Sequence, residues 1–178
     1  MLHNLLQNNK IKLRALEPED LEYLYKWEND TALWEHSNTL SPYSRYVIKN
    51  YIENSHQDIF ETKQQRFMID SFDENSTIGT IDLFDIDFYN LRAGVGILIA
   101  EEKYRHKGFA GQALELLIQY SFKHLSLYQL YCSINENNHA SLKLFQNYGF
   151  VITGKKIAWL KSVGEMNDVY FLQLLANK

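Results

Sequence analysis

The chain reads Tyr104-Arg105-His106-Lys107-Gly108-Phe109-Ala110-Gly111 where an apolar run, residues 94–100, gives way to a segment with apolar residues at helical spacing. This basic, glycine-containing turn is therefore predicted to open a helix. The first N–H groups of a helix have no partner within it, and the helix dipole is positive there, so an anion is favoured. Gly108 and Ala110 let backbone amides reach phosphate oxygens, and Arg105 and Lys107 add positive charge. The turn is predicted to bind a pyrophosphate.

Two common phosphate-binding patterns do not occur in the chain. It has no G-x-x-x-x-G-K-[ST] sequence, and no G-x-G-x-x-G followed by an acidic ribose partner. A nucleoside triphosphatase and a dinucleotide-dependent dehydrogenase are therefore disfavoured.

Composition favours one compact domain over residues 1–178. The chain has 46% hydrophobic residues, two prolines and a net charge of -4, which argues against nucleic acid as a partner. It contains no run of about eighteen apolar residues that would span a bilayer and no apolar signal segment, so we expect a cytoplasmic protein without membrane contact. Cys132, the single cysteine, allows neither a disulfide framework nor a CxxC metal spacing, and no metal is expected.

Periodicity and turn residues predict alternating strands and helices without an internal repeat. The predicted strands cover residues 12–16, 66–71, 77–84, 91–100, 129–134, 151–158 and 166–174. The predicted helices cover residues 18–28 and 140–148, a segment beginning at Ser41-Pro42 and the segment after the basic turn. This order predicts an α/β fold, a mixed sheet with helices on both faces.

A second motif, Asn138-x-x-Ser141-Leu142-x-Leu144-Phe145-x-x-Tyr148-Gly149-Phe150, follows the strand after the basic turn. Together with Arg105-x-x-Gly108-x-Ala110 it resembles the acetyl-CoA-binding core of the GNAT superfamily of N-acyltransferases, from about Thr77 to Phe150. The sequence segments 11–21, 66–69 and 127–131 resemble those of one GNAT branch, which contains the spermidine and the ribosomal-protein alanine acetyltransferases. The resemblance implies a mostly antiparallel sheet in which two central parallel strands splay apart and hold the cofactor.

The resemblance also implies which residues contact acetyl-CoA, the acyl donor. Leu98 and Ala100 would offer backbone groups to the pantetheine arm. The pyrophosphate would be surrounded by Arg105, His106, Lys107, Gly108, Ala110 and Gly111. Asn138, Ser141 and Phe145 would contact the cofactor from the other arm of the wedge, although Asn138 is also typical of a helix cap.

Acetyl transfer to an amine requires a neutral amine, a stabilised oxyanion and a proton for the leaving thiolate. The resemblance implies a backbone N–H near Leu98 as the oxyanion donor. Relatives often carry a tyrosine as thiolate acid where this chain has Phe145, and a strand glutamate where it has Gly94. The thiolate is then protonated by Tyr148, by water or by no acid at all, and Asp82 is the leading candidate for the base.

Acceptor binding is predicted from two groups of acidic and aromatic residues. Asp82, Asp85 and Asp87 alternate with apolar residues, and Asp82 and Asp85 are candidates to hold the substrate ammonium; the same alternation is typical of a half-solvated strand. The resemblance places the acceptor pocket near the end of the first helix, where an aromatic and acidic cage for a cation is one interpretation and tryptophans packing a helix are the other. This second group comprises Trp27, Glu28, Trp34 and Glu35.

The leading hypothesis is an acetyl-CoA-dependent N-acetyltransferase acting on a primary amine, either a polyamine-like small molecule or a protein N-terminus, by direct attack in a ternary complex. The alternative is a catalytically silent acyl-CoA-binding module with a sensing or interaction role, suggested by Phe145 and Gly94. A third interpretation, a scaffold without cofactor, makes both motifs coincidental. Trp159, Tyr170 and Phe171 in the last strands suit a homodimer or the core.

Overall fold

The computed structural model describes residues 5–37, 39–55, 57–162 and 164–176, with the backbone alone described at 35–37. The chain divides into two compact units. The larger comprises Met1–Arg14 and Lys63–Lys178, and the smaller comprises Ala15–Thr62.

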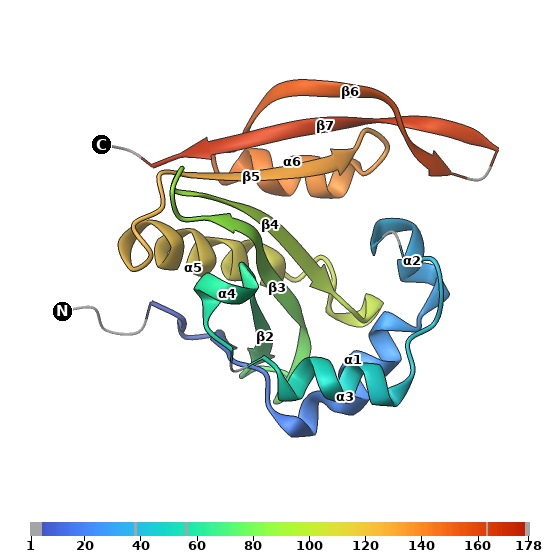
Figure 1. Ribbon diagram of the computed structural model, residues 1–178, viewed down its shortest axis with the longest axis vertical. Helices are drawn as coiled ribbons and strands as arrows, with labels where there is room; N and C mark the ends of the chain where they lie inside the picture. Colours follow the sequence, from blue (N-terminus) through green and yellow to red (C-terminus); the bar gives the residue numbers. More distant parts are fainter. Residues whose placement is uncertain (1–4, 38, 56, 163, 177–178) are drawn as a thin grey trace. The chain divides into compact units, whose positions relative to one another are not determined.

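The larger unit is built on a seven-stranded sheet in the order β1-β2-β3-β4-β5-β7-β6. Every neighbouring pair is antiparallel except β4 and β5, which are parallel. The mixed, mostly antiparallel sheet with a central parallel pair is thus confirmed (Figure 1). The strands are β1 Ile11–Arg14, β2 Gln65–Ser71, β3 Ser76–Asp87, β4 Arg92–Ile99, β5 Gln129–Asn135, β6 Val151–Ser162 and β7 Glu165–Leu175.

The helix α5, Phe109–Lys123, makes the crossover that a parallel pair requires. It begins at Phe109, within the basic turn that was predicted to open a helix, and packs against β1, β3 and β4. Phe109, Ala113, Leu116 and Leu117 are buried, so the apolar side inferred from helical spacing is the side that faces the sheet. The 3-10 helix η2, Glu102–Tyr104, joins β4 to the basic turn.

Strands β4 and β5 diverge along their length. They pair only over Arg92–Gly94 and Gln129–Tyr131, while β4 stays paired with β3 as far as Ile99 and β5 with β7 as far as Asn135. Figure 1 shows the two strands close together at their beginnings and apart at their ends. The predicted splay is confirmed, and it opens toward the segment that leads into α5 and the turn that precedes α6, His139–Asn147.

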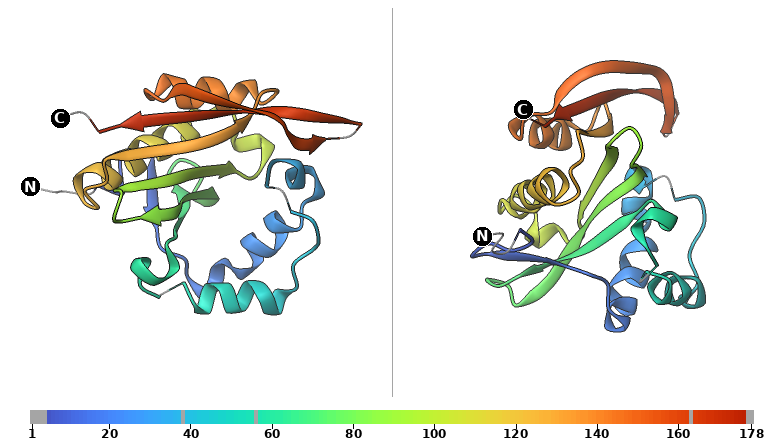
Figure 2. Two further views of the ribbon diagram at one scale, coloured as in Figure 1. Left: turned by 45° about the horizontal axis from the view of Figure 1, so that its top comes forward. Right: turned by 60° about the vertical axis from the view of Figure 1, so that its left-hand side comes forward.

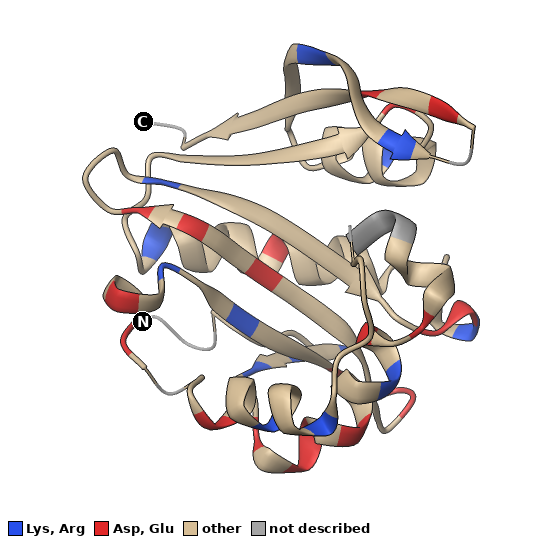
Figure 3. Cartoon of the chain, turned by 45° about the vertical axis from the view of Figure 1, so that its right-hand side comes forward, with Lys and Arg blue, Asp and Glu red and all other residues tan. Residues whose placement is uncertain are grey.

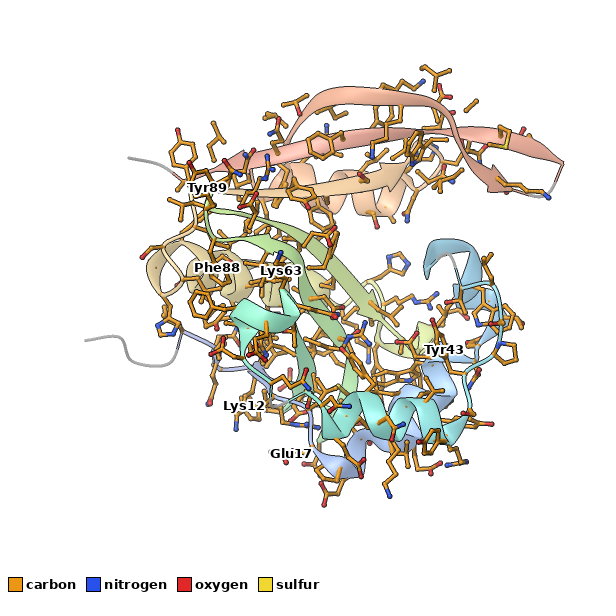
Figure 4. All side chains as sticks on the ribbon, viewed as in Figure 1. Lys12, Glu17, Tyr43, Lys63, Phe88 and Tyr89 are labelled. Atoms are coloured by element: carbon orange, nitrogen blue, oxygen red, sulfur yellow. The ribbon has the colours of Figure 1, made fainter. Side chains whose placement is uncertain are left out.

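Strand β3 extends beyond its predicted end. The chain turns at Phe88 and Tyr89 before β4 (Figure 4), and β3 continues to Asp87 because the ladder with β4 resumes there after an irregularity. Asp85 sits in that irregularity with a φ of 47°, a left-handed conformation that a regular strand does not use. Simple alternation therefore predicts the strand but not the bulge that lengthens it.

The last two strands form a hairpin longer than predicted, with β6 at the edge of the sheet (Figure 2). Lys155 ties it together: its Nζ lies 2.6 Å from Asp168 Oδ2 and 3.0 Å from Glu136 Oε2. Asp168 Oδ1 also accepts a 2.7 Å hydrogen bond from the Ala158 N–H, beside an irregularity in the register. The extra length comes from backbone pairs nearer the turn, Leu160 with Asn167, Lys161 with Met166 and Ser162 with Glu165.

The smaller unit is helical, with the elements η1 Pro18–Asp20, α1 Leu21–Glu28, α2 Thr31–Ser37, α3 Arg45–Glu53 and α4 Ile59–Thr62. The predicted 18–28 helix is divided into η1 and α1. The helix predicted to begin at Ser41-Pro42 begins later, because the Ser44 hydroxyl accepts a 3.2 Å hydrogen bond from the Val47 N–H and caps α3 there. The short helices α2 and α4 were not predicted.

In the part of the chain that the structure describes, no helix has the length and apolar character needed to cross a membrane.

Candidate active site

The turn before α5 has a backbone suited to presenting N–H groups. His106 and Gly108 both have positive φ, 60° and 81°, and Gly108 is the N-cap of α5. A Cβ on Gly108 would meet only the Gln112 side chain at 4.0 Å, so conformation, not space, requires glycine there. The predicted anion-binding turn therefore forms at the start of a fifteen-residue helix.

Both permanent cations of the turn already have partners in the protein. The Arg105 guanidinium donates from Nε to the Ile99 carbonyl at 3.1 Å and from Nη2 to the Ala100 carbonyl at 3.0 Å. Lys107 Nζ lies 2.6 Å from Glu74 Oε1 in the β2–β3 turn. The Arg105 side chain, predicted to lie at the pyrophosphate, thus ties the turn to the end of β4.

The register of β4 shows which backbone groups face the opening toward β5. Ala100 donates to the Ile78 carbonyl at 3.0 Å, and the Leu98 carbonyl lies against Gly79 of β3. In an antiparallel ladder, successive residues direct their N–H and C=O groups to opposite sides. The backbone of Leu98 therefore faces β3, and the backbone groups of Ile97 and Ile99 face the opening. The Ala100 N–H is likewise used on the β3 side, so the family-based assignments to Leu98 and to Ala100 are both displaced by one residue along the strand.

The opposite arm of the wedge begins at Asn138. Its side chain accepts a 3.1 Å hydrogen bond from the Ser141 N–H, so Asn138 caps α6, as its residue type predicted. Phe145 is 3% exposed and its ring meets Phe150 edge-on, with centroids 5.0 Å apart. Phe145 therefore occupies the core, and its contact with the cofactor stays a prediction.

Tyr148, the C-cap of α6, packs against the first turn of α5. A Cβ on Gly111 would lie 2.5 Å from Tyr148 Oη, so any larger residue at position 111 would displace the Tyr148 ring. Burial, and then the charge of Glu115, raise the pKa of Tyr148 above its ordinary value. The hydroxyl is thus protonated at neutral pH and keeps its proton beside the first turn of α5.

The missing strand glutamate has a structural counterpart in Phe84. Phe84 pairs with Gly94, and a Cβ on Gly94 would lie 2.3 Å from the Phe84 ring. The ring also meets Tyr131 of β5 edge-on at 6.1 Å, and Tyr131 meets Phe171 of β7 at 5.5 Å. A row of aromatic rings therefore covers Gly94, the position at which the resemblance implies a glutamate.

Asp82, the predicted base, is held by an arginine on the neighbouring strand. Its Oδ1 accepts a 2.6 Å hydrogen bond from Arg66 Nε, and both side chains are largely buried. Figure 3 shows acidic positions along β3 beside a basic position on β2. Asp82 lies opposite Gly96 on the face that carries Phe84, whereas Asp85 is exposed in the bulge. The structure therefore does not place the two aspartates in one regular row.

The tryptophans of the smaller unit have structural roles. Trp27 is 4% exposed, with its ring 5.3 Å from Tyr23, and Trp34 Nε1 donates to the Glu28 carbonyl at 2.8 Å. These contacts agree with the packing interpretation, and the indole N–H of Trp34 ties α2 to the end of α1. The side chain of Glu35 lies outside the described residues. An acceptor cage here stays a prediction.

Sequence reasoning missed Glu74, Phe84 and Tyr131 as parts of this region. Glu74 is an acidic residue in a turn, and nothing in the local sequence pairs it with Lys107, thirty-three positions away. In the sequence, Phe84 is one apolar residue of an alternating strand. Its contact with Gly94 follows only from the strand register, which places the two residues opposite each other.

A parallel pair that opens at its carboxyl ends, with a glycine-capped helix on one arm and an asparagine-capped helix on the other, defines the class of protein. The chain belongs to the GNAT acetyltransferases: the model of the Acetyltransferase (GNAT) domain matches residues 10–151. It is accordingly an N-acetyltransferase by family, as the motifs at 104–111 and 138–150 indicated.

Individual relatives narrow the comparison. The chain is 29% identical over 147 residues to spermidine N(1)-acetyltransferase of Escherichia coli (strain K12), covering 83% of this chain and 76% of that protein. It is 27% identical over 176 residues to the putative ribosomal N-acetyltransferase YdaF of Bacillus subtilis (strain 168), covering 94% and 92%. A spermidine acetyltransferase and a putative ribosomal acetyltransferase are thus both among the proteins that this chain is similar to.

A solved structure shares the fold. The crystal structure of spermidine N-acetyltransferase from Vibrio cholerae, in complex with CoA and spermine, superimposes with a TM-score of 0.84 at 24% identity. The match covers 94% of this chain and 96% of that one. This likeness establishes the fold.

Proposed function

We propose that this protein transfers the acetyl group of acetyl-CoA to a primary amine, by direct attack of the amine in a ternary complex. The observation that carries the proposal is the opening between β4 and β5, whose pairing stops at Gly94 and Tyr131. Backbone groups past that point on β4 are available to a ligand that adds along the strand. The capped helix α5 begins beyond the end of the same strand and supplies N–H groups for the pyrophosphate.

The oxyanion of the tetrahedral intermediate is assigned to a backbone N–H of β4. Val95 adjoins the last β4–β5 pair, and Ile97 is the next residue whose backbone faces the opening, so we assign the Ile97 N–H this role in place of Leu98. Ile99 would contact the pantetheine arm. The turn at 105–111 binds the pyrophosphate in this proposal, and Asn138 and Ser141 contact the cofactor, as the two motifs suggest.

Proton transfer is assigned to two groups. Asp82 receives a proton from the ammonium, directly or through water, and Tyr148 protonates the thiolate of CoA. Both lie in the larger unit, and the Arg66 contact fixes the Asp82 carboxylate in one orientation. The acceptor is a polyamine-like molecule or a protein N-terminus, as the names of the relatives suggest, and a role for Asp85, Trp27, Glu28, Trp34 and Glu35 in holding it is part of this proposal.

We also propose that the two compact units act as one acetyltransferase domain. The family match spans residues 10–151 and therefore includes the whole of the smaller unit, Ala15–Thr62. A homodimer and a cytoplasmic location stay predictions from the sequence.

Thiol release from acetyl-CoA tests the proposal. Purified protein is assayed with spermidine, with a peptide bearing a free N-terminus and without acceptor. Acceptor-dependent thiol release supports the enzyme, and the better acceptor identifies the substrate class. CoA binding without release above the no-acceptor control for any amine would favour the silent module that Phe145 and Gly94 suggested. Asp82→Asn, run beside the wild type, should lower turnover more than it weakens cofactor binding.

A further inference from the structure

The basic turn at residues 104–111 carries an ion pair that a phosphate bound there would have to share or displace. Lys107 Nζ and Glu74 Oε1 are 2.6 Å apart, with the two side chains 47% and 29% exposed. Glu74 is positioned by its own turn, because its N–H donates to Ser71 Oγ at 3.2 Å and Asn75 follows in a left-handed conformation with a φ of 44°. The carboxylate is therefore presented to Lys107 by the β2–β3 connection.

This pair offsets part of the positive charge of the turn. Arg105 directs both of its described hydrogen bonds to the Ile99 and Ala100 carbonyls, whereas Lys107, the other permanent cation of the turn, contacts the Glu74 carboxylate. Lys107 also lies 5.8 Å from the Tyr104 ring centroid, beside Lys103 at 4.6 Å. A phosphate bound at the start of α5 would meet a lysine whose charge is already offset by Glu74.

We propose that Glu74 competes with the cofactor's phosphates for Lys107 and so weakens the binding of both acetyl-CoA and its product CoA. This inference rests on the proposed cofactor site. A carboxylate offers the ammonium the same kind of charged oxygen as a phosphate does. A partly exposed pair of this kind is weak, so a multiply charged ligand exchanges with it readily. Because substrate and product carry the same phosphates, Glu74 favours release of CoA after transfer.

The test uses CoA as the probe and calorimetry as the measurement, at low ionic strength. Glu74→Gln keeps the size of the side chain and removes its charge, and it should lower the Kd of CoA by about threefold to tenfold. Added salt should shrink the difference, because exposed charges are screened. Glu101→Gln is the matched control: it removes one charge from the segment just before the basic turn, where Glu101 pairs with Lys103 at 3.1 Å, and it should leave the Kd near the wild-type value.

A double variant separates competition from a general loss of negative charge. If Glu74 acts through Lys107, Glu74→Gln should give no gain in a protein that also carries Lys107→Ala. An equal gain in that background, or no gain from Glu74→Gln alone while the wild type binds CoA normally, would overturn this inference and leave the proposed function standing. Failure of the wild-type protein to bind CoA at all would overturn both.

Discussion

Glycines at neighbouring positions of one strand have different reasons to be glycine. Gly94 faces the Phe84 ring so closely that any added carbon must displace it, whereas the nearest atom to a Cβ on Gly96 is Phe84 Cε1 at 3.8 Å, an ordinary contact. The Phe84 ring therefore occupies the space that the side chain of a glutamate at position 94 would need. A carboxylate can be introduced there only if the ring moves.

We expect Gly94→Ala to lower the free energy of unfolding by about 1–3 kcal/mol, the usual cost of overpacking. Gly96→Ala is its matched control and should be neutral or slightly stabilising, since alanine restricts the unfolded chain more than glycine does. Urea denaturation of the two variants and the wild type measures the difference. Equal stability of the two variants would show that Phe84 moves aside without cost.

A second expectation at the residue scale concerns Tyr148. Tyr148→Phe keeps the ring against Gly111 and removes the proton, so kcat should fall by about a hundredfold while the KM for acetyl-CoA changes little. Because the pKa of Tyr148 is raised above its ordinary value of 10.0, the donor stays active through neutral pH and loses its proton only above that value. The wild-type pH profile of kcat checks this. An unchanged kcat in the variant would assign the proton to water.

The connection between β4 and α5 is held by the two hydrogen bonds of the Arg105 guanidinium. Two carbonyls at the end of β4 are bridged by one planar guanidinium, and this geometry fixes where the helix starts. The positive φ of His106 and of Gly108 then turns the chain into the first turn of α5. The start of α5, where we propose that the pyrophosphate binds, is thus positioned by contacts within the protein.

Arg105→Ala is expected to raise the KM for acetyl-CoA by about tenfold, which corresponds to about 1.4 kcal/mol of binding free energy. Arg105→Lys distinguishes positioning of the turn from direct binding of phosphate. Lysine keeps the charge but cannot donate two parallel hydrogen bonds, so the KM should stay raised if Arg105 acts by positioning the turn. A wild-type KM in Arg105→Lys would instead show that Arg105 acts as a phosphate ligand. Lys103→Ala controls for the loss of a nearby cation.

At the scale of the whole molecule, the sequence was informative where structure is local. The turn at 104–111, the helix after it and the Asn138 cap depend on neighbouring residues, and each was predicted from them. The contacts of Lys107 with Glu74, of Asp82 with Arg66 and of Gly94 with Phe84 depend on strand register and hairpin geometry. Hydrophobic periodicity contains no information on strand register or hairpin geometry. The basic turn could therefore be predicted from the sequence, but the pairing of its Lys107 with Glu74 could not.

The stability of the molecule should also depend on pH through Cys132 in β5. The thiol is 2% exposed, and burial raises its pKa from 9.0 to about 12. Above pH 9.0 the unfolded chain therefore loses the thiol proton while the folded protein keeps it. With fewer protons bound in the unfolded state, the free energy of unfolding must fall as pH rises, by up to about 1.4 kcal/mol per pH unit from this group.

Cys132→Ala isolates that contribution, because every other titrating group is common to the two proteins. Urea unfolding under reducing conditions at about pH 8 and about pH 10 should show the wild type losing more stability than the variant over this interval. The variant should be less stable than the wild type at the lower pH, since it leaves a small cavity in the core. The gap between them should narrow at the higher pH. If the difference in unfolding free energy between the two proteins stayed constant, the Cys132 thiol would ionise as readily in the folded protein as in the unfolded chain.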